Sequence, residues 1–246
     1  MRRDILTAIM FLTRIRVPDD VDHSPDALAR STAYFPLVGI IVGAIGAAVY
    51  FLANLLFTPT VAAVFAVAAT ACVTGAFHED AFADVCDGFG GYTPEKRREI
   101  MRDSRVGSFA VVGLTCLIAA KLLLVGSLAP ICAVLALPFA HAVGRWASVW
   151  LIFRTPYVDD PESLAKPFAG QVTPERLAIA TATTALFGAL AFGVPLTLAA
   201  FGITVALCFG AERFFKGFVG GLTGDCLGAT NQVAELLIYA LVAATF

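Results

Sequence analysis

The chain has 246 residues, of which 59% are hydrophobic and 15% are charged, and its mean hydropathy is +0.82. Soluble domains are typically about 45–50% apolar and about 25% charged, so this composition excludes an ordinary soluble domain and indicates an integral membrane protein. The formal net charge of −2 gives no basic surface for a nucleic acid, and no nucleic-acid partner is expected.

The segment before the first apolar stretch predicts an amphipathic helix that lies on the membrane surface. Ile5, Ile9 and Leu12 share one helical face. Arg14 and Arg16 follow where a signal peptide would have a small-residue cleavage site. A flexible tail is the alternative for this segment.

Seven stretches are long and apolar enough to cross a membrane, for which a helix needs about 20 mostly apolar residues. In chain order they are residues 33–57, 60–77, 108–128, 131–153, 177–194, 196–212 and 226–246. Gly39 and Gly43 form a small-x-x-x-small pattern that is typical of close helix packing. The sequence therefore predicts an all-α fold: one domain, residues 1–246, forming a polytopic membrane bundle of about seven transmembrane helices.

The basic residues predict how this bundle is oriented. Fifteen of the 17 Lys and Arg lie in alternate segments between the apolar stretches, and the turns near Pro59, Pro130 and Pro195 contain none. Basic residues close to span ends stay on the cytoplasmic side. We therefore expect a multi-pass protein of the cytoplasmic (inner) membrane, with lipid around it and with the N-terminus and the charged segments facing the cytoplasm.

An acidic segment, residues 77–91 (FHEDAFADVCDGFGG), follows the second apolar stretch directly. On a helix Asp80, Asp84 and Asp87 fall within about 60° of one another, and Glu79 falls to the side. Like charges at this spacing destabilise a helix unless a cation lies among them, and oxygen ligands select Mg²⁺, Mn²⁺ or Ca²⁺. The pattern predicts a metal site, and a solvated helix end is the alternative.

A basic segment follows, in which Arg102 and Arg105 flank Asp103 and Ser104. Cationic side chains beside a metal-binding face indicate a phosphate site, because phosphoryl transfer depends on positioning and on neutralising charge. We interpret the two arginines as catalytic candidates and the two residues between them as substrate-binding candidates. The alternative, which we favour for Lys96-Arg97, is that the basic residues only set the topology.

The third charged region is residues 220–235 (GGLTGDCLGATNQVAE). Glycines before a helix let backbone N–H groups approach an anion, so Thr223 and Gly224 are candidates for binding a phosphate. Asp225 is expected to be either the N-cap of the helix or a working carboxylate.

Polar side chains inside the apolar stretches form a further set of substrate-binding candidates: Arg145, Asn231 and Glu235. Glu235 follows Asp225 by ten residues, which is about 15 Å along a helix. An ionisable group at that depth is a candidate functional residue. A structural pairing of Glu235 with Arg145 or Lys121 is the alternative.

Four stretches together resemble the signatures of the cobalamin synthase family, the adenosylcobinamide-GDP ribazoletransferases: HEDAFADVCDGFGG, IMRDSRVGSFA, GRWASVWLIFRTPY and GGLTGDCLGATNQVAE. With the N-terminal FLTRIRVP, the resemblance extends over nearly the whole chain. The usual signatures are E-D-G-x-A-D-x-x-D-G and K-D-S-R-x-G. This chain departs from them at Ala81 for Gly, at Arg102 for Lys, and at Ala110, where Gly is common.

The resemblance implies an Mg²⁺-dependent membrane transferase whose small-molecule substrates are adenosylcobinamide-GDP and α-ribazole or its 5′-phosphate. GMP leaves, and the product is adenosylcobalamin or its 5′-phosphate. The hypothesis assigns four roles: Mg²⁺ binding to Asp80, Asp84 and Asp87 with help from Glu79, charge neutralisation to Arg102 and Arg105, phosphate binding to Thr223 and Gly224, and proton removal to Asp225. Whether residues 153–168 cover the substrate, and whether the protein forms a homo-oligomer, are left open.

Two other functions share features with this chain. A CDP-alcohol phosphotransferase of phospholipid synthesis also has aspartates at helical spacing, but its D-G-x-x-A-R signature is missing, since Phe-Gly-Gly-Tyr follows Asp87-Gly88. A cation-coupled transporter would have its ligands close to the middle of the bilayer. The acidic residues here lie at span ends, which favours chemistry at the membrane surface.

Overall fold

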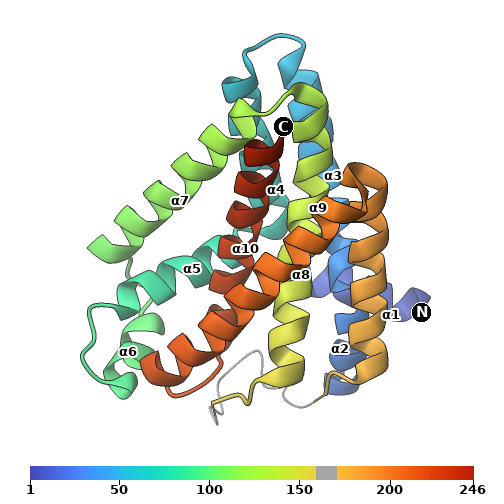
Figure 1. Ribbon diagram of the computed structural model, residues 1–246. Helices are drawn as coiled ribbons and strands as arrows, with labels where there is room; N and C mark the ends of the chain where they lie inside the picture. The colour runs from blue at the N-terminus through green and yellow to red at the C-terminus, as the bar shows by residue number, and fades with distance from the viewer. Residues whose placement is uncertain (159–170) are drawn as a thin grey trace.

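The structure is a computed structural model that describes residues 1–158 and 171–246 (Figure 1). In these residues the regular elements are all helices, and the β contact is an isolated bridge between Tyr157 and Leu222. The helices are α1 (Arg2–Leu12), α2 (Pro25–Ser31), η1 (Thr32–Tyr34), α3 (Phe35–Asn54), α4 (Pro59–Thr74), α5 (Phe77–Gly88), α6 (Pro94–Met101), α7 (Ser108–Ser127), α8 (Pro130–Arg154), α9 (Pro174–Phe218) and α10 (Gly224–Thr245). Most of the segment 153–168 lies outside the described residues.

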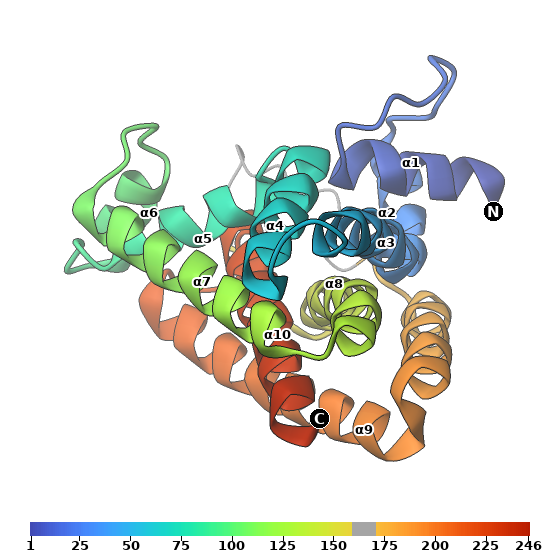
Figure 2. The ribbon, with the colours of Figure 1, turned by 90° about the horizontal axis from the view of Figure 1, so that it is seen from above.

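The prediction of an all-α membrane bundle is confirmed. By length and composition, five of the described helices are able to cross a membrane, and six if the bent pair α4 and α5 is one span. This count treats α9 as a single helix, although Gly193 breaks it at φ 80 and ψ 165, a conformation that favours glycine. Figures 1 and 2 show the two halves of α9 meeting at a corner there. The predicted stretches 177–194 and 196–212 are therefore counted as one helix, and the predicted stretch 60–77 is counted only together with α5, which accounts for the difference from the predicted seven.

Helix α8 lies inside the bundle, with α3, α9 and α10 around it (Figure 2). It is buried along most of its length, whereas α7 and α9 leave most of their apolar surface exposed, as lipid-facing helices do. An added Cβ at Gly39 would lie 2.3 Å from the carbonyl oxygen of His141, and one at Gly43 would lie 2.3 Å from Cα of Pro138. The predicted close packing through these two glycines is therefore confirmed.

Helix α1 confirms the helix predicted for the N-terminal segment. Thr7, Ala8 and Leu12 are its buried residues, and the chain beyond it is tied to the end of α4 by a hydrogen bond of 2.7 Å from the N–H of Arg14 to the carbonyl oxygen of Val73. That α1 lies on a membrane surface stays a prediction.

Helix α5, which carries the acidic segment, turns away from α4 by 91°. Gly75 and Ala76 make this bend, with φ of 67° and 55° in the left-handed region. The bend places α5 across α10, where Gly228 faces Ala81: an added Cβ on the glycine would lie 2.4 Å from Cβ of the alanine. The two helices therefore touch at backbone distance.

We predict that Gly228→Ala lowers the melting temperature of the detergent-solubilised protein, because its new methyl group overlaps Ala81 and overpacking typically costs about 1–3 kcal/mol. Ala81→Gly in the same chain vacates that space and is expected to restore stability. Gly210→Ala is the control, since an added Cβ there meets nothing within 4 Å. A Gly228→Ala protein as stable as the parent, or no recovery in the double variant, would show that α5 and α10 are not in this contact.

Candidate active site

The acidic residues of α5 lie where this helix packs against the beginning of α10. Asp80 is exposed, while Asp84 and Asp87 are half-buried. Asp225, in the first turn of α10, is also half-buried. Because Gly228 lets the two helices touch, the carboxylate of Asp225 comes close enough to act on Asp84 through its charge.

The pKa of Asp84 reflects this crowding of carboxylates. Helix α5 is not one of the five described helices that are able to cross a membrane by themselves; it bends 91° from α4 and carries four carboxylates in 12 residues. Burial raises the pKa of the Asp84 carboxyl to about 7, and three neighbouring carboxylates add to the rise: Asp225, Asp80 and Asp87. Repelling oxygen donors of this kind are a favourable setting for a hard cation such as Mg²⁺.

The donor set suits a cation that is shared with a substrate. Among the residues that the structure describes, no three Asp, Glu, His or Cys side chains are already arranged as a ligand set. Mg²⁺ typically takes one or two protein carboxylates and completes its octahedron with water and substrate phosphate. The residues of α5 and α10 fit that manner of binding.

Asp87 has a structural role that its sequence position does not indicate. Its carboxylate accepts hydrogen bonds from the N–H of Gly107 (2.7 Å, at Oδ2) and the N–H of Ala110 (2.8 Å, at Oδ1). It therefore caps the N-terminus of α7, where a negative charge is favourable. Each oxygen keeps a further lone pair, so the cap does not prevent Asp87 from binding a cation.

The basic loop between α6 and α7 contains a tight internal ion pair. Arg105 donates to both carboxylate oxygens of Asp103, with Nε to Oδ1 at 3.0 Å and Nη2 to Oδ2 at 2.5 Å. These hydrogen bonds lower the pKa of Asp103 to about 2. The Arg105 side chain is 88% exposed, and Arg102 and Ser104 are exposed in the same loop. The four predicted residues are thus together and open to a solute.

Two other arginines of the basic segment hold the end of α9. Arg97 donates to the carbonyl oxygen of Phe218 at 3.1 Å and lies 4.6 Å above the centre of that ring, and Arg98 donates to the carbonyl oxygen of Val219. Charged donors satisfy the carbonyls that a helix C-terminus leaves unpaired. The sequence analysis favoured a purely topological role for Arg97 and did not predict this contact with Phe218.

The glycine segment forms the start of α10. Thr223 is the N-cap, because its hydroxyl accepts from the N–H of Cys226 at 3.3 Å. The alternative that Asp225 is the N-cap is therefore wrong, since Asp225 lies inside the first turn. Gly220 and Gly221 have φ of 90° and 157°, and Leu222 pairs through its backbone with residues 156–158.

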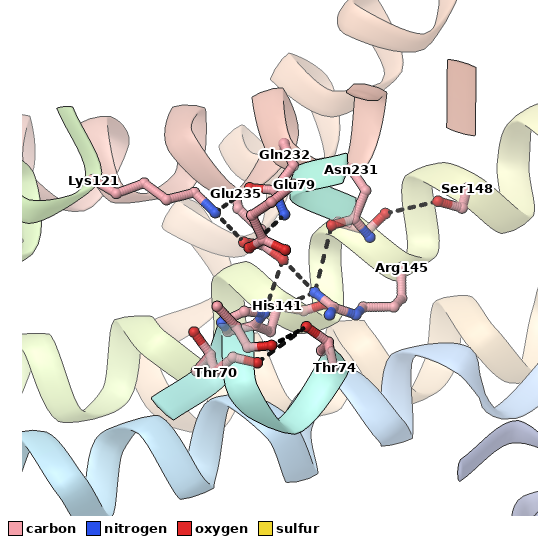
Figure 3. Close-up of polar contacts among 12 residues, drawn as sticks. Thr70, Thr74, Glu79, Lys121, His141, Arg145, Ser148, Asn231, Gln232 and Glu235 are labelled. Carbon is pink, nitrogen blue, oxygen red and sulfur yellow. Dashed lines mark hydrogen bonds and ion pairs between the residues drawn. The ribbon is translucent and has the colours of Figure 1, made fainter. Parts of the chain in front are cut away.

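A buried polar network lies between α5, α7, α8 and α10 (Figure 3). Its centre is Glu235, which has no exposed surface. Lys121 Nζ donates to one carboxylate oxygen at 2.7 Å, His141 Nδ1 lies 2.8 Å from the other, and Arg145 donates to that same oxygen. The structural pairing weighed for Glu235 is confirmed, with both of the cations considered.

Two amide side chains extend the network. Asn231 accepts from Arg145 at 3.5 Å. Gln232 accepts from Lys121 and donates to Glu79 Oε1 at 3.2 Å. Arg145, Asn231 and Glu235 thus have protein partners, and their binding of substrate stays a prediction. The sequence analysis did not identify Gln232, although an amide inside an apolar span is a signal that could have found it.

We predict opposite stability changes for Asp84→Asn and Asp87→Asn when melting is measured in EDTA. At about pH 8, where a carboxyl with a pKa of about 7 is mostly ionised, Asp84→Asn removes a charge from a crowded carboxylate group and is expected to raise the melting temperature. Asp87→Asn loses one of two accepted hydrogen bonds at the start of α7, which typically costs about 0.5–2 kcal/mol, and is expected to lower it. Shifts of the same sign would contradict the two different roles.

Comparison with known proteins identifies the family of the chain. Residues 4–243 match the family model described as cobalamin-5-phosphate synthase. Proteins named adenosylcobinamide-GDP ribazoletransferase align along almost their full length: the one from Polaromonas naphthalenivorans is 40% identical (96% of this chain, 96% of the relative), and that from Ralstonia nicotianae is 41% identical (96% and 93%). The relative from Vibrio parahaemolyticus is 36% identical (95% and 89%). No solved structure matches the chain. The chain therefore belongs to the cobalamin-5-phosphate synthase family.

Proposed function

We propose that this protein is an adenosylcobinamide-GDP ribazoletransferase that acts late in cobalamin biosynthesis. The relatives with that name are about 40% identical to this chain, and the alignments cover nearly the whole of both chains. The observation that carries the proposal is the contact of α5 with α10, which brings the acidic segment and the glycine segment to one place.

The proposed reaction breaks the phosphoanhydride bond of adenosylcobinamide-GDP and forms a phosphodiester bond. A ribose hydroxyl oxygen of α-ribazole, or of its 5′-phosphate, forms a bond to the phosphorus that carries the cobinamide. The bond from that phosphorus to the bridging oxygen breaks, and GMP leaves with this oxygen. Asp225 takes the proton of that hydroxyl, and its place beside Asp84 puts it within the same group of carboxylates.

The other residues of the proposed site handle charge. Asp80, Asp84 and Asp87 would hold Mg²⁺, which supplies positive charge to the diphosphate oxygens when bound. Arg102 and Arg105, exposed in one loop, would stabilise the charge that develops on GMP, with Asp103 and Ser104 beside them. Backbone groups at Thr223 and Gly224 would bind a phosphate at the beginning of α10, where the helix dipole favours an anion.

The location of the site completes the proposal. The apolar helices support a membrane protein. We infer, from the placement of basic residues, that it lies in the inner membrane with its N-terminus and this site on the cytoplasmic side, where nucleotide-activated substrates occur. Lipid would surround α7 and α9, whose apolar surfaces are exposed.

We predict Mg²⁺-dependent formation of GMP and a complete corrinoid, identified by mass, when the purified protein in detergent receives adenosylcobinamide-GDP and α-ribazole. Asp80→Asn and Asp84→Asn are expected to lower turnover at least about 100-fold, because charge stabilisation at a phosphoryl group is lost. Turnover without a gradient separates an enzyme from a transporter. Consumption of CDP-diacylglycerol with a small alcohol, and no corrinoid product, would favour the phospholipid enzyme instead.

We predict that Asp225→Asn lowers kcat by about 10²–10⁴-fold at saturating α-ribazole and Mg²⁺, which is the usual contribution of a general base. Asp26→Asn, an exposed acid in the first turn of α2, is the control and is expected to keep parental turnover. Near-normal turnover of Asp225→Asn would reject Asp225 as the proton acceptor.

A further inference from the structure

Glu79 does not share the environment of the three aspartates that follow it in the helix. Its Oε1 accepts from Gln232 Nε2 at 3.2 Å, and its Oε2 is buried without a hydrogen-bond partner among the described residues. Figure 3 shows this carboxylate facing the polar network between the helices. Glu79 is thus connected to α10 by its own hydrogen bond, one residue before Asp80.

The network is an ordered chain in which each hydrogen-bond donor meets an acceptor. It runs from the Glu79 carboxylate to the Gln232 amide, then to the Lys121 ammonium, and ends at the Glu235 carboxylate. An amide is suited to the second place because its NH₂ donates to a carboxylate while its oxygen accepts from an ammonium. Neither a carboxylate nor an ammonium at position 232 could do both.

Burial makes this order hard to change. Gln232 is 1% exposed, Lys121 is 4% exposed and Glu235 is fully buried. Two carboxylates, Glu79 and Glu235, are matched by two cations, Lys121 and Arg145. Removing one partner of a buried pair leaves a charge without compensation, which is strongly unfavourable.

We propose that Glu79, Gln232 and Lys121 are positioning residues that set the rotation of α5 relative to α10, and that Glu79 does this in place of binding the metal. This inference rests on the proposed function, since it assigns the orientation of the carboxylates used in that reaction. Gly228 against Ala81 determines how closely the helices approach. The hydrogen bond from Gln232 to Glu79 determines which face of α5 is presented.

The consequence for the site follows from helix geometry. Residues 79, 80 and 84 belong to one rigid helix, so a rotation that brings Glu79 away from Gln232 moves Asp80 and Asp84 by the same angle. The distance between Asp84 and Asp225 then changes. Catalytic groups need to be held within a fraction of an ångström, so the network acts on turnover without touching the substrate.

The test is a reciprocal exchange across the hydrogen bond. Gln232→Glu places two carboxylates against each other and is expected to lower kcat at least about tenfold, with KM for adenosylcobinamide-GDP within about threefold of the parent. Glu79→Gln in the same chain restores the pairing of donors with acceptors. The amide at position 79 then donates to the carboxylate at position 232, which still accepts from Lys121. We expect the double variant to recover kcat to within about threefold of the parent.

Gln171→Glu, the same substitution at an exposed position, is the matched control and is expected to behave as the parent. Melting temperatures of the four proteins of the cycle, in EDTA and with increasing Mg²⁺, give a readout besides activity. The double variant is expected to regain both the parental melting temperature and the parental Mg²⁺ concentration for half-maximal stabilisation.

A double variant that stays inactive and needs about tenfold more Mg²⁺, as Glu79→Gln alone would if Glu79 were a metal ligand, would overturn the inference. If Gln232→Glu yields no folded protein, recovery of folded protein by the exchange supports the inference, and no recovery overturns it. Failure of the proposed function is separate: the parent and Gln171→Glu would then make no product, while the melting cycle would still test the coupling of Glu79 to Gln232.

Discussion

Glu235 is a carboxylate without solvent inside a bundle of apolar helices, and it is stable there only because Lys121 of α7 and Arg145 of α8 donate to it. This requirement ties three helices to one point. Gln232, one turn earlier on α10, carries the connection to Glu79 of α5. Four helices are thus held together by a single set of buried charges, and the helix with the acidic residues is one of them.

The candidate active site is formed by carboxylates of α5 and α10 that lie outside that network. The 91° bend after α4 turns α5 across α10, and the contact of Ala81 with Gly228 brings Asp84 and Asp225 into mutual range. The side chain of Asp87 connects the same helix to the beginning of α7 by a hydrogen bond. The basic loop before α7 therefore ends beside the acidic residues. The carboxylates that would bind a cation are therefore carried by adjoining helix ends, and the arginines that would meet a phosphate lie in the loop before α7.

Much of the fold could be read from composition and periodicity. The apolar stretches correspond to the helices, the break of α9 lies at Gly193 close to the predicted turn at Pro195, and Gly39 with Gly43 packs closely on α8. These features depend on residues near one another in the chain, where helix length, glycine conformation and charge placement act directly. The grouping of three aspartates on one face of a helix is of the same local kind.

The sequence by itself determined that the chain is a helical membrane protein, where its apolar helical stretches lie, and that three aspartates form a repelling face suited to a cation. Only the tertiary structure decided that Asp87 caps a helix 20 residues away, that Arg97 binds the end of α9 across 121 residues, and that Glu79 belongs with Gln232, 153 residues further on. The physical reason is that hydrogen-bond partners of buried charges are selected by packing in three dimensions, and spacing along one helix carries no information about them.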